Sequence, residues 1–147
     1  MDFSKFNSRE AAETPRDLQL KHPATGELLF NDGVKRKEPC IVSLIGTESR
    51  TAQIALRAIQ KAKVKGDKKH DDQSLEDLHS TLVESAKPLI RGFKNIHLGT
   101  RAATLEDIDD ILGAQLINGQ DGEQSFVEQI MTFATKRANF MGNGSPS

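Results

Sequence analysis

The sequence predicts an α+β fold that is mainly helical, with a small N-terminal antiparallel sheet of about three strands followed by about four α-helices. Residues 17–45 contain short alternating or β-branched runs separated by turn-rich stretches, as in a small sheet. From residue 47 onward the apolar residues recur at spacings of three and four, the period of an amphipathic helix. The length of 147 residues suits one domain with a single core.

We expect three parts along the chain: a flexible N-terminal arm at 1–16, one α+β domain at 17–141, and a disordered tail at 142–147. The arm is polar apart from Phe3 and Phe6, and Pro15 disfavours helix at Thr14. The two phenylalanines could anchor the arm to the body or to a neighbour, and a frayed terminus fits equally well. The tail consists of Gly, Asn, Ser and Pro, a composition typical of disorder.

Three short strands are expected in the β unit. The first, 17–21, alternates polar and apolar residues, and the turn-rich segment 22–27 separates it from the second, 28–30. Asn31, Asp32 and Gly33 give a second turn signal, and the third strand, 40–45, is rich in β-branched residues and ends at Gly46. Because short strands are stable only when paired, we expect one small sheet.

The first helix is expected to begin after Thr47 or Ser49 as N-cap and to run to about Val64. Its apolar face comprises Ala52, Ala55, Leu56, Ile59 and Ala62. The segment 61–72, which is rich in lysine and almost free of apolar residues, is interpreted as a solvated loop.

The second and third helices carry N-cap signals. Ser74 with Asp77 opens the second helix, in which Pro88 should produce a kink. Its inward residues are expected to be Leu75, Leu78, Leu82, Ala86, Leu89 and Phe93. Thr104 with Asp107 opens the third helix, whose inward residues are expected to be Leu105, Ile108, Ile111 and Leu112.

The last helix is expected to span 126–141, after a loop at 119–122. Its apolar residues cover an arc of roughly 180° at 100° per residue, whereas a surface helix needs only about 100° to cover a core. The helix is therefore either packed on two sides within its own domain or also in contact with another chain. Arg137 lies inside the arc and must either extend to water or pair with a carboxylate. The candidate partner-binding residues are Phe126, Ile130, Phe133, Arg137 and Phe140, together with Phe93.

Composition argues against several classes of protein. A formal net charge of −1 and the absence of Trp and Tyr do not suit a protein that binds nucleic acid. Cys40 is the only cysteine, so it forms no intrachain disulfide; we interpret it as a small buried hydrophobe in a reducing cytoplasm. No stretch approaches the roughly 18 apolar residues of a membrane span, and the N-terminus has no apolar signal core.

Catalytic and metal-binding signals are weak. The histidines at 22, 70, 79 and 97 lack ligand spacing. The carboxylates between Glu106 and Asp110 lack the glycine and alternating ligands of a calcium loop. No glycine cluster forms a phosphate-binding loop, and no Ser or Cys has the local signature of an activated nucleophile. We therefore expect no enzyme, no cofactor and no metal site.

The order of motifs resembles the tail assembly chaperones of long-tailed (siphovirus-like) bacteriophages and prophages over about residues 17–141. The segment His22-Pro23-Ala24-Thr25-Gly26-Glu27 is similar to the "hP.tGe" opening of that family, and Gly46-Thr47-Glu48-Ser49 to its "G.dS" motif. The segment 86–93 resembles the "l...i.gW" motif, with Phe93 in place of tryptophan. The segments 126–130 and 138–141 resemble the close of the family's last helix.

The resemblance implies a chaperone that coats the long, helical tape measure protein and keeps it soluble in the host bacterial cytoplasm. It implies self-association, a contact with the tail tube protein through a frameshifted longer product, and absence from the mature virion. The alternatives are a structural head-to-tail joining or tail terminator component of the virion, a small protein that binds a host complex, and a nucleic-acid binder acting through Lys61–Lys69. An enzyme ranks last.

Overall fold

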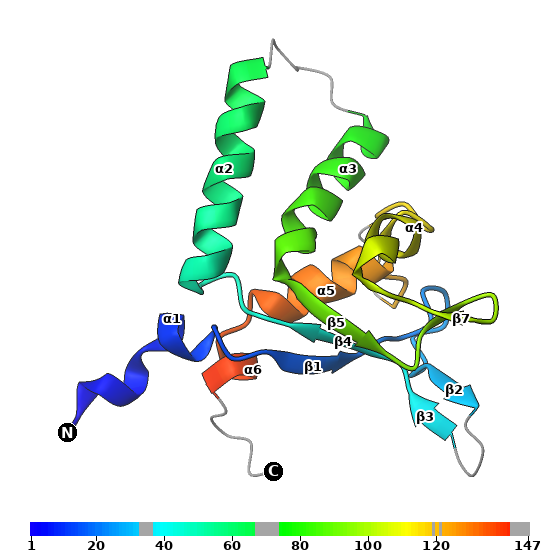
Figure 1. The fold of residues 1–147 in the computed structure, drawn as a ribbon, viewed down its shortest axis with the longest axis horizontal. Coiled ribbons are helices and arrows are strands. Elements are labelled where there is room, and N and C mark those ends of the chain that lie inside the picture. The colour runs from blue at the N-terminus through cyan, green and yellow to red at the C-terminus, as the bar shows by residue number, and fades with distance from the viewer. Residues whose placement is uncertain (33–36, 67–73, 119, 121, 142–147) are drawn as a thin grey trace.

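The computed structural model describes residues 1–147 except 33–36, 67–73, 119, 121 and 142–147. Its centre is a three-stranded antiparallel sheet in the order β1-β4-β5, formed by β1 (Arg16–Gln19), β4 (Ile41–Leu44) and β5 (Ile90–Lys94) (Figure 1). Leu18 pairs with Val42, which in turn pairs with Phe93, so apolar side chains share one face of the sheet. The chain is therefore α+β, as predicted.

Two short ribbons extend the β structure. β2 (Phe30–Asp32) pairs with β3 (Lys37–Pro39), and β6 (His97–Leu98) pairs with β7 (Arg101–Ala102). Asn31 and Asp32, expected in a turn, therefore lie in a strand. The prediction of one sheet from 17–21, 28–30 and 40–45 was wrong for the second strand. β2 pairs with β3 in a separate ribbon, and residues 90–94 supply the third strand of the central sheet.

The kinked helix predicted up to Phe93 ends earlier. α3 (Leu75–Ala86) is followed by the 3-10 turn η2 (Lys87–Leu89) and then by β5. Pro88 has no N–H to continue the helical hydrogen bonds, so it ends the helix rather than kinking it. The following residues complete the ladder of β4, which would otherwise leave one edge unpaired.

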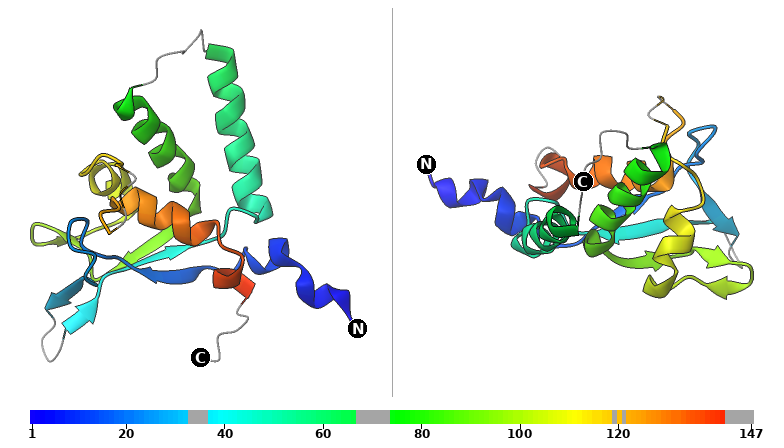
Figure 2. Two further views of the ribbon diagram at one scale, coloured as in Figure 1. Left: turned by 180° about the vertical axis from the view of Figure 1, so that it is seen from behind. Right: turned by 90° about the horizontal axis from the view of Figure 1, so that it is seen from above.

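α2 (Arg50–Gly66) and α3 rise from the same side of the body (Figures 1 and 2). The predicted N-caps are confirmed: Ser49 Oγ accepts a hydrogen bond from the Ala52 amide at 3.0 Å, and Ser74 Oγ accepts one from the Asp77 amide at 3.1 Å. The predicted loop 61–72 is wrong at its start, because α2 continues to Gly66. The rest of it, 67–72, lies outside the described residues.

The third predicted helix is confirmed in outline. Thr104 and Asp107 form a capping box before η3 (Leu105–Asp107) and α4 (Ile108–Leu112). Ile108, Ile111 and Leu112 are buried as expected, but Leu105 is exposed.

The predicted helix 126–141 is two helices, α5 (Phe126–Ala134) and α6 (Ala138–Met141). The last carbonyl groups of α5 accept hydrogen bonds from groups that are not the amides of a continuing helix. Phe133 O accepts from Asn139 Nδ2 at 2.8 Å, and Ala134 O accepts from the Thr47 amide at 3.0 Å. One local hydrogen bond, from Asn139, and one long-range hydrogen bond, from Thr47, therefore replace helical ones, and the single apolar arc does not exist.

The N-terminal arm differs from the flexible segment that we expected. It contains η1 (Phe3–Phe6) and α1 (Ser8–Ala11), with Asn7 as the N-cap of α1. Ala12 is buried, and its carbonyl accepts a hydrogen bond from the Gly46 amide at 2.9 Å. Residues 8–12 are thus docked on the body, while Phe3 and Phe6 are exposed on a projecting segment (Figure 1).

Candidate functional site

The predicted partner-binding stripe is mainly core. Ile130 and Phe140 are fully buried, so their assignment to a partner surface was wrong for this conformation. Phe93, Phe126 and Phe133 are half-buried and pack against the core cluster. The reason is that α5 lies between the sheet and α3, and both neighbours take up its apolar surface.

Arg137 is the one exposed member of the predicted set. Its Nε donates to both carboxylate oxygens of Glu48 at 3.0 Å, and its Nη2 lies 3.0 Å from Glu48 Oε2. These hydrogen bonds lower the pKa of Glu48 below its ordinary value. Arg137 therefore pairs with a carboxylate of its own chain, one of the two outcomes expected from sequence.

A mostly apolar groove lies between α2 and α3, with a volume of about 650 Å³. We call it the α2–α3 groove, and it is lined by Ile59, Ala62, Glu84, Lys87, Pro88 and Ile108. Its walls belong to three separate helical segments and to the turn η2. The groove is not predictable from the sequence, although the helical period places Ile59 and Ala62 on one apolar face.

The α2 wall of the groove is an apolar stripe that the fold covers only at its base. Ala52 is fully buried, Leu56 and Ile59 are half-buried, and Ala62 is exposed. Burial thus falls steadily along the stripe, because α2 stands away from α3 towards its C-terminal end (Figure 1). An apolar face of this length normally covers a core, whereas the fold leaves this one exposed at Ala62.

α3 also exposes apolar residues near its N-terminal end. Its buried positions are His79, Val83 and Ala86, whereas Leu75 and Leu78 are 49% and 44% exposed. The prediction that these two leucines face inward was wrong. Only part of α3 packs on α5, so the residues of its first turn find no core to cover.

Charges mark the rim of the groove. Glu84 lines it, and Asp77 lies seven residues earlier on the same face of α3. Lys87 Nζ lies 3.1 Å from Asp109 Oδ1, so this lysine is already paired. The groove therefore combines an apolar floor with an acidic α3 wall.

Other polar features have structural explanations. His22 Nδ1 accepts hydrogen bonds from the amides of Ala24 and Thr25 at 3.0 and 3.3 Å, which fixes the turn before Gly26. A small hollow of about 190 Å³ borders this turn. It contains Gln129, whose side-chain amide bonds to both the N–H and the carbonyl of Lys21.

Metal-ligand groups and the single cysteine were the remaining candidates for a reactive site. No group of three His, Cys, Asp or Glu residues there could hold a metal ion. Burial raises the pKa of the Cys40 thiol, which donates to the Asn95 carbonyl at 3.3 Å and lacks the features of an activated nucleophile. No described helix is both long enough and apolar enough to cross a membrane.

Comparisons with protein-family models, with curated proteins and with solved structures return no match to this chain.

Proposed function

We propose that this chain is a tail assembly chaperone of a long-tailed bacteriophage or prophage, a non-enzymatic protein that binds the tape measure protein and keeps it soluble during tail morphogenesis. It would act in the host bacterial cytoplasm, self-associate along its client, contact the tail tube protein through a longer product, and leave before the virion is complete. The family resemblance supplies the identity of the client.

The observation that carries the proposal is the partly uncovered apolar stripe of α2 in the α2–α3 groove. A groove between two helices accepts the apolar face of a third helix, the usual mode of helix recognition. A long helical client presents such a face many times over. Weak contacts repeated along it give strong total binding that remains reversible.

The groove replaces the surface that the sequence predicted. Ile130 and Phe140 are unavailable because they are buried, and Phe133 contacts the Phe140 ring at 5.6 Å between centroids. Substitution at these positions would test folding rather than binding. Ala62 is the better probe, because it lines the groove and is exposed.

The test is co-expression with the tape measure protein of the same tail gene cluster. We expect the wild-type chain to bring the tape measure protein into a soluble complex that co-purifies. Ala62→Glu places a carboxylate in the apolar groove and should abolish this rescue. Gln60→Glu is the matched control, since it adds the same group at an exposed position of α2 that lines no described hollow, and it should preserve the rescue.

Two results would contradict the proposal. In the first, the tape measure protein stays insoluble while this chain is folded and abundant. In the second, mass spectrometry of purified particles finds this chain as a constant component, which would favour a head-to-tail joining or tail terminator protein. Equal rescue by Ala62→Glu and wild type would exclude the groove as the client site.

A further inference from the structure

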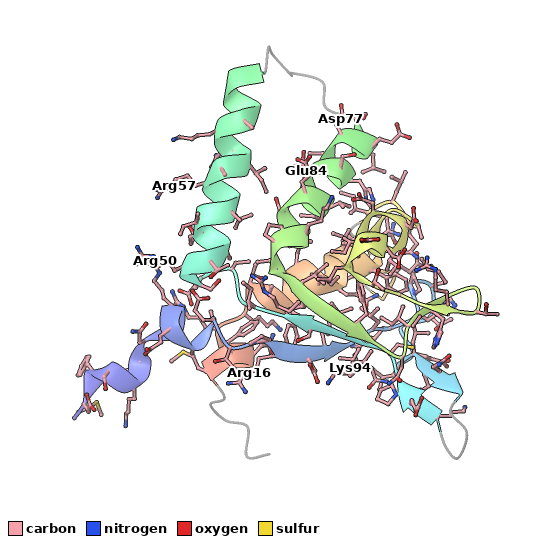
Figure 3. The ribbon with its side chains drawn as sticks, viewed as in Figure 1. Arg16, Arg50, Arg57, Asp77, Glu84 and Lys94 are labelled. Atoms are coloured by element: carbon pink, nitrogen blue, oxygen red, sulfur yellow. The ribbon has the colours of Figure 1, made fainter. Side chains whose placement is uncertain are left out.

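The outer side of α2 carries a second surface, distinct from the α2–α3 groove. We call it the basic face, and it surrounds a hollow of about 540 Å³ lined by Arg9, Arg50, Gln53, Ile54, Arg57, Ala58 and Lys61. At about 100° per residue, Arg50, Arg57 and Lys61 lie roughly opposite Ile59 and about 100–140° from Ala62 around the helix. Figure 3 shows Arg50 and Arg57 pointing away from α3.

Most cations of this face are not neutralised within the described part of the chain; Arg9 is the exception, because its Nε donates to the Glu48 carbonyl and its charge favours the ionised Glu48 carboxylate. None of the ion pairs formed there involves Arg50, Arg57 or Lys61. The nearby carboxylates have other partners, because Glu48 pairs with Arg137 and Glu13 accepts from Thr51 Oγ1 at 2.9 Å. Positive charge is therefore concentrated on one side of a chain whose net charge is −1.

An apolar residue lies among these charges. Ile54 is 63% exposed and follows Arg50 by four residues, so it lies on the same face as Arg50 and Arg57. An apolar centre with a charged rim is the arrangement of a protein interface, in which the centre excludes water and the rim provides orientation.

We propose that the basic face is a docking site for an acidic amphipathic helix of a partner protein. Arg50 and Arg57 are seven residues apart, which is about 10.5 Å along the helix axis at 1.5 Å per residue. Carboxylates at the same spacing on a partner helix would meet both guanidinium groups, and an apolar residue between them would cover Ile54. Nucleic acid fits less well, because phosphates gain nothing from Ile54 and the chain lacks Trp and Tyr for stacking on bases.

The test measures binding of a labelled helical peptide to the full chain by fluorescence anisotropy. The peptide carries Glu at positions i, i+7 and i+11 and Leu at i+4. A peptide of the same composition in scrambled order is the reference for charge alone. We expect the ordered peptide to bind more tightly than the scrambled one, with an affinity that falls as salt increases.

Three variants separate the contribution of charge to peptide binding from that of apolar contact. Arg57→Glu should weaken binding about tenfold or more, because it removes a cation that meets a peptide carboxylate and places a like charge opposite that carboxylate. Ile54→Lys adds a positive charge, so a purely electrostatic surface would bind the peptide more tightly, whereas the proposed interface predicts weaker binding. Lys37→Glu makes the same charge change as Arg57→Glu on β3, far from α2, and should leave the affinity unchanged. All three positions are exposed, and circular dichroism checks the fold.

The proposal is overturned if Ile54→Lys strengthens binding, or if the scrambled peptide or a single-stranded oligonucleotide binds as tightly as the ordered peptide. It is also overturned if sedimentation shows that the chain self-associates through this face and that Arg57→Glu dissociates the assembly, because the occupant would then be a second copy. None of these outcomes depends on the tape measure protein.

Discussion

Three segments pack closely around Gly46, and Gly46→Ala tests that packing. A Cβ atom at this position would lie 2.9 Å from Ala12 Cβ and 3.1 and 3.2 Å from two ring carbons of Phe140. The neighbours belong to the docked end of the N-terminal arm and to α6, both of which pack beside the end of β4. The substitution therefore forces either the arm or α6 to move.

The magnitude follows from two opposing effects. Overpacking of a well-filled site costs about 1–3 kcal/mol. At a position whose folded backbone alanine can adopt without strain, replacing glycine by alanine stabilises the protein by about 0.4–1 kcal/mol, because alanine lowers the conformational entropy of the unfolded chain. We expect a net loss of about 1–2 kcal/mol, which lowers Tm by roughly 3–6 °C for a domain of this size.

The assay is urea unfolding followed by circular dichroism, with wild type, Gly46→Ala, Ala12→Gly and the double variant. Ala12→Gly removes the shortest contact, so the double variant should recover about 1 kcal/mol relative to the sum of the single changes. The slope of the transition should not change. A Gly46→Ala protein as stable as wild type, or more stable, would refute the close packing of Ala12 and Phe140 around Gly46, because the new methyl group would then have room.

Three further predictions concern stability. Ile130→Ala should cost about 3 kcal/mol by leaving a cavity under α5, whereas the exposed Thr132→Ala should stay within about 0.5 kcal/mol in the same urea assay; equal effects would contradict the burial of Ile130. His79→Leu should stabilise by about 1 kcal/mol, since neither ring nitrogen of this buried histidine has a hydrogen-bond partner among the described residues, and a loss of stability would show that the ring is satisfied. Hydrogen bonds from Arg101 at 2.9 and 3.0 Å, with one from the Thr104 amide, hold the pKa of Asp107 below its ordinary value of 3.8. The carboxylate therefore stabilises the fold at neutral pH, and its contribution is lost as pH falls below 3.8 towards the lowered folded-state value. Asp107→Asn should lower Tm at pH 7 and reduce the loss of Tm on acidification; an unchanged pH dependence would contradict this role.

Local chemistry determined the helix starts. Ser49, Ser74 and Thr104 are N-caps in the structure as in the sequence, because a side-chain oxygen and an amide N–H a few residues away form the cap with no help from the rest of the chain. The break at Pro88 was also visible in sequence, since proline removes a helical hydrogen bond. Only its consequence, a strand rather than a kinked helix, required the unpaired edge of β4.

Tertiary structure decided which apolar residues are core. A helical wheel gives the angle of a side chain but not the direction in which the neighbouring elements lie, so it placed Leu75 and Leu78 inside and overlooked His79. The end of α5 shows the same limit, since the Ala134 carbonyl accepts from the amide of Thr47, a residue distant in sequence.

The α2–α3 groove likewise depends partly on the sequence alone and partly on the tertiary structure. The sequence by itself determined that one face of α2 is apolar, because the spacing of Ala52, Ile59 and Ala62 follows from the helical period alone. Only the tertiary structure decided that the upper part of this face stays uncovered, because the angle at which α2 and α3 leave the sheet is set by long-range packing at their bases. The sequence supplies the apolar surface, and packing at a distance determines how much of it a partner can reach.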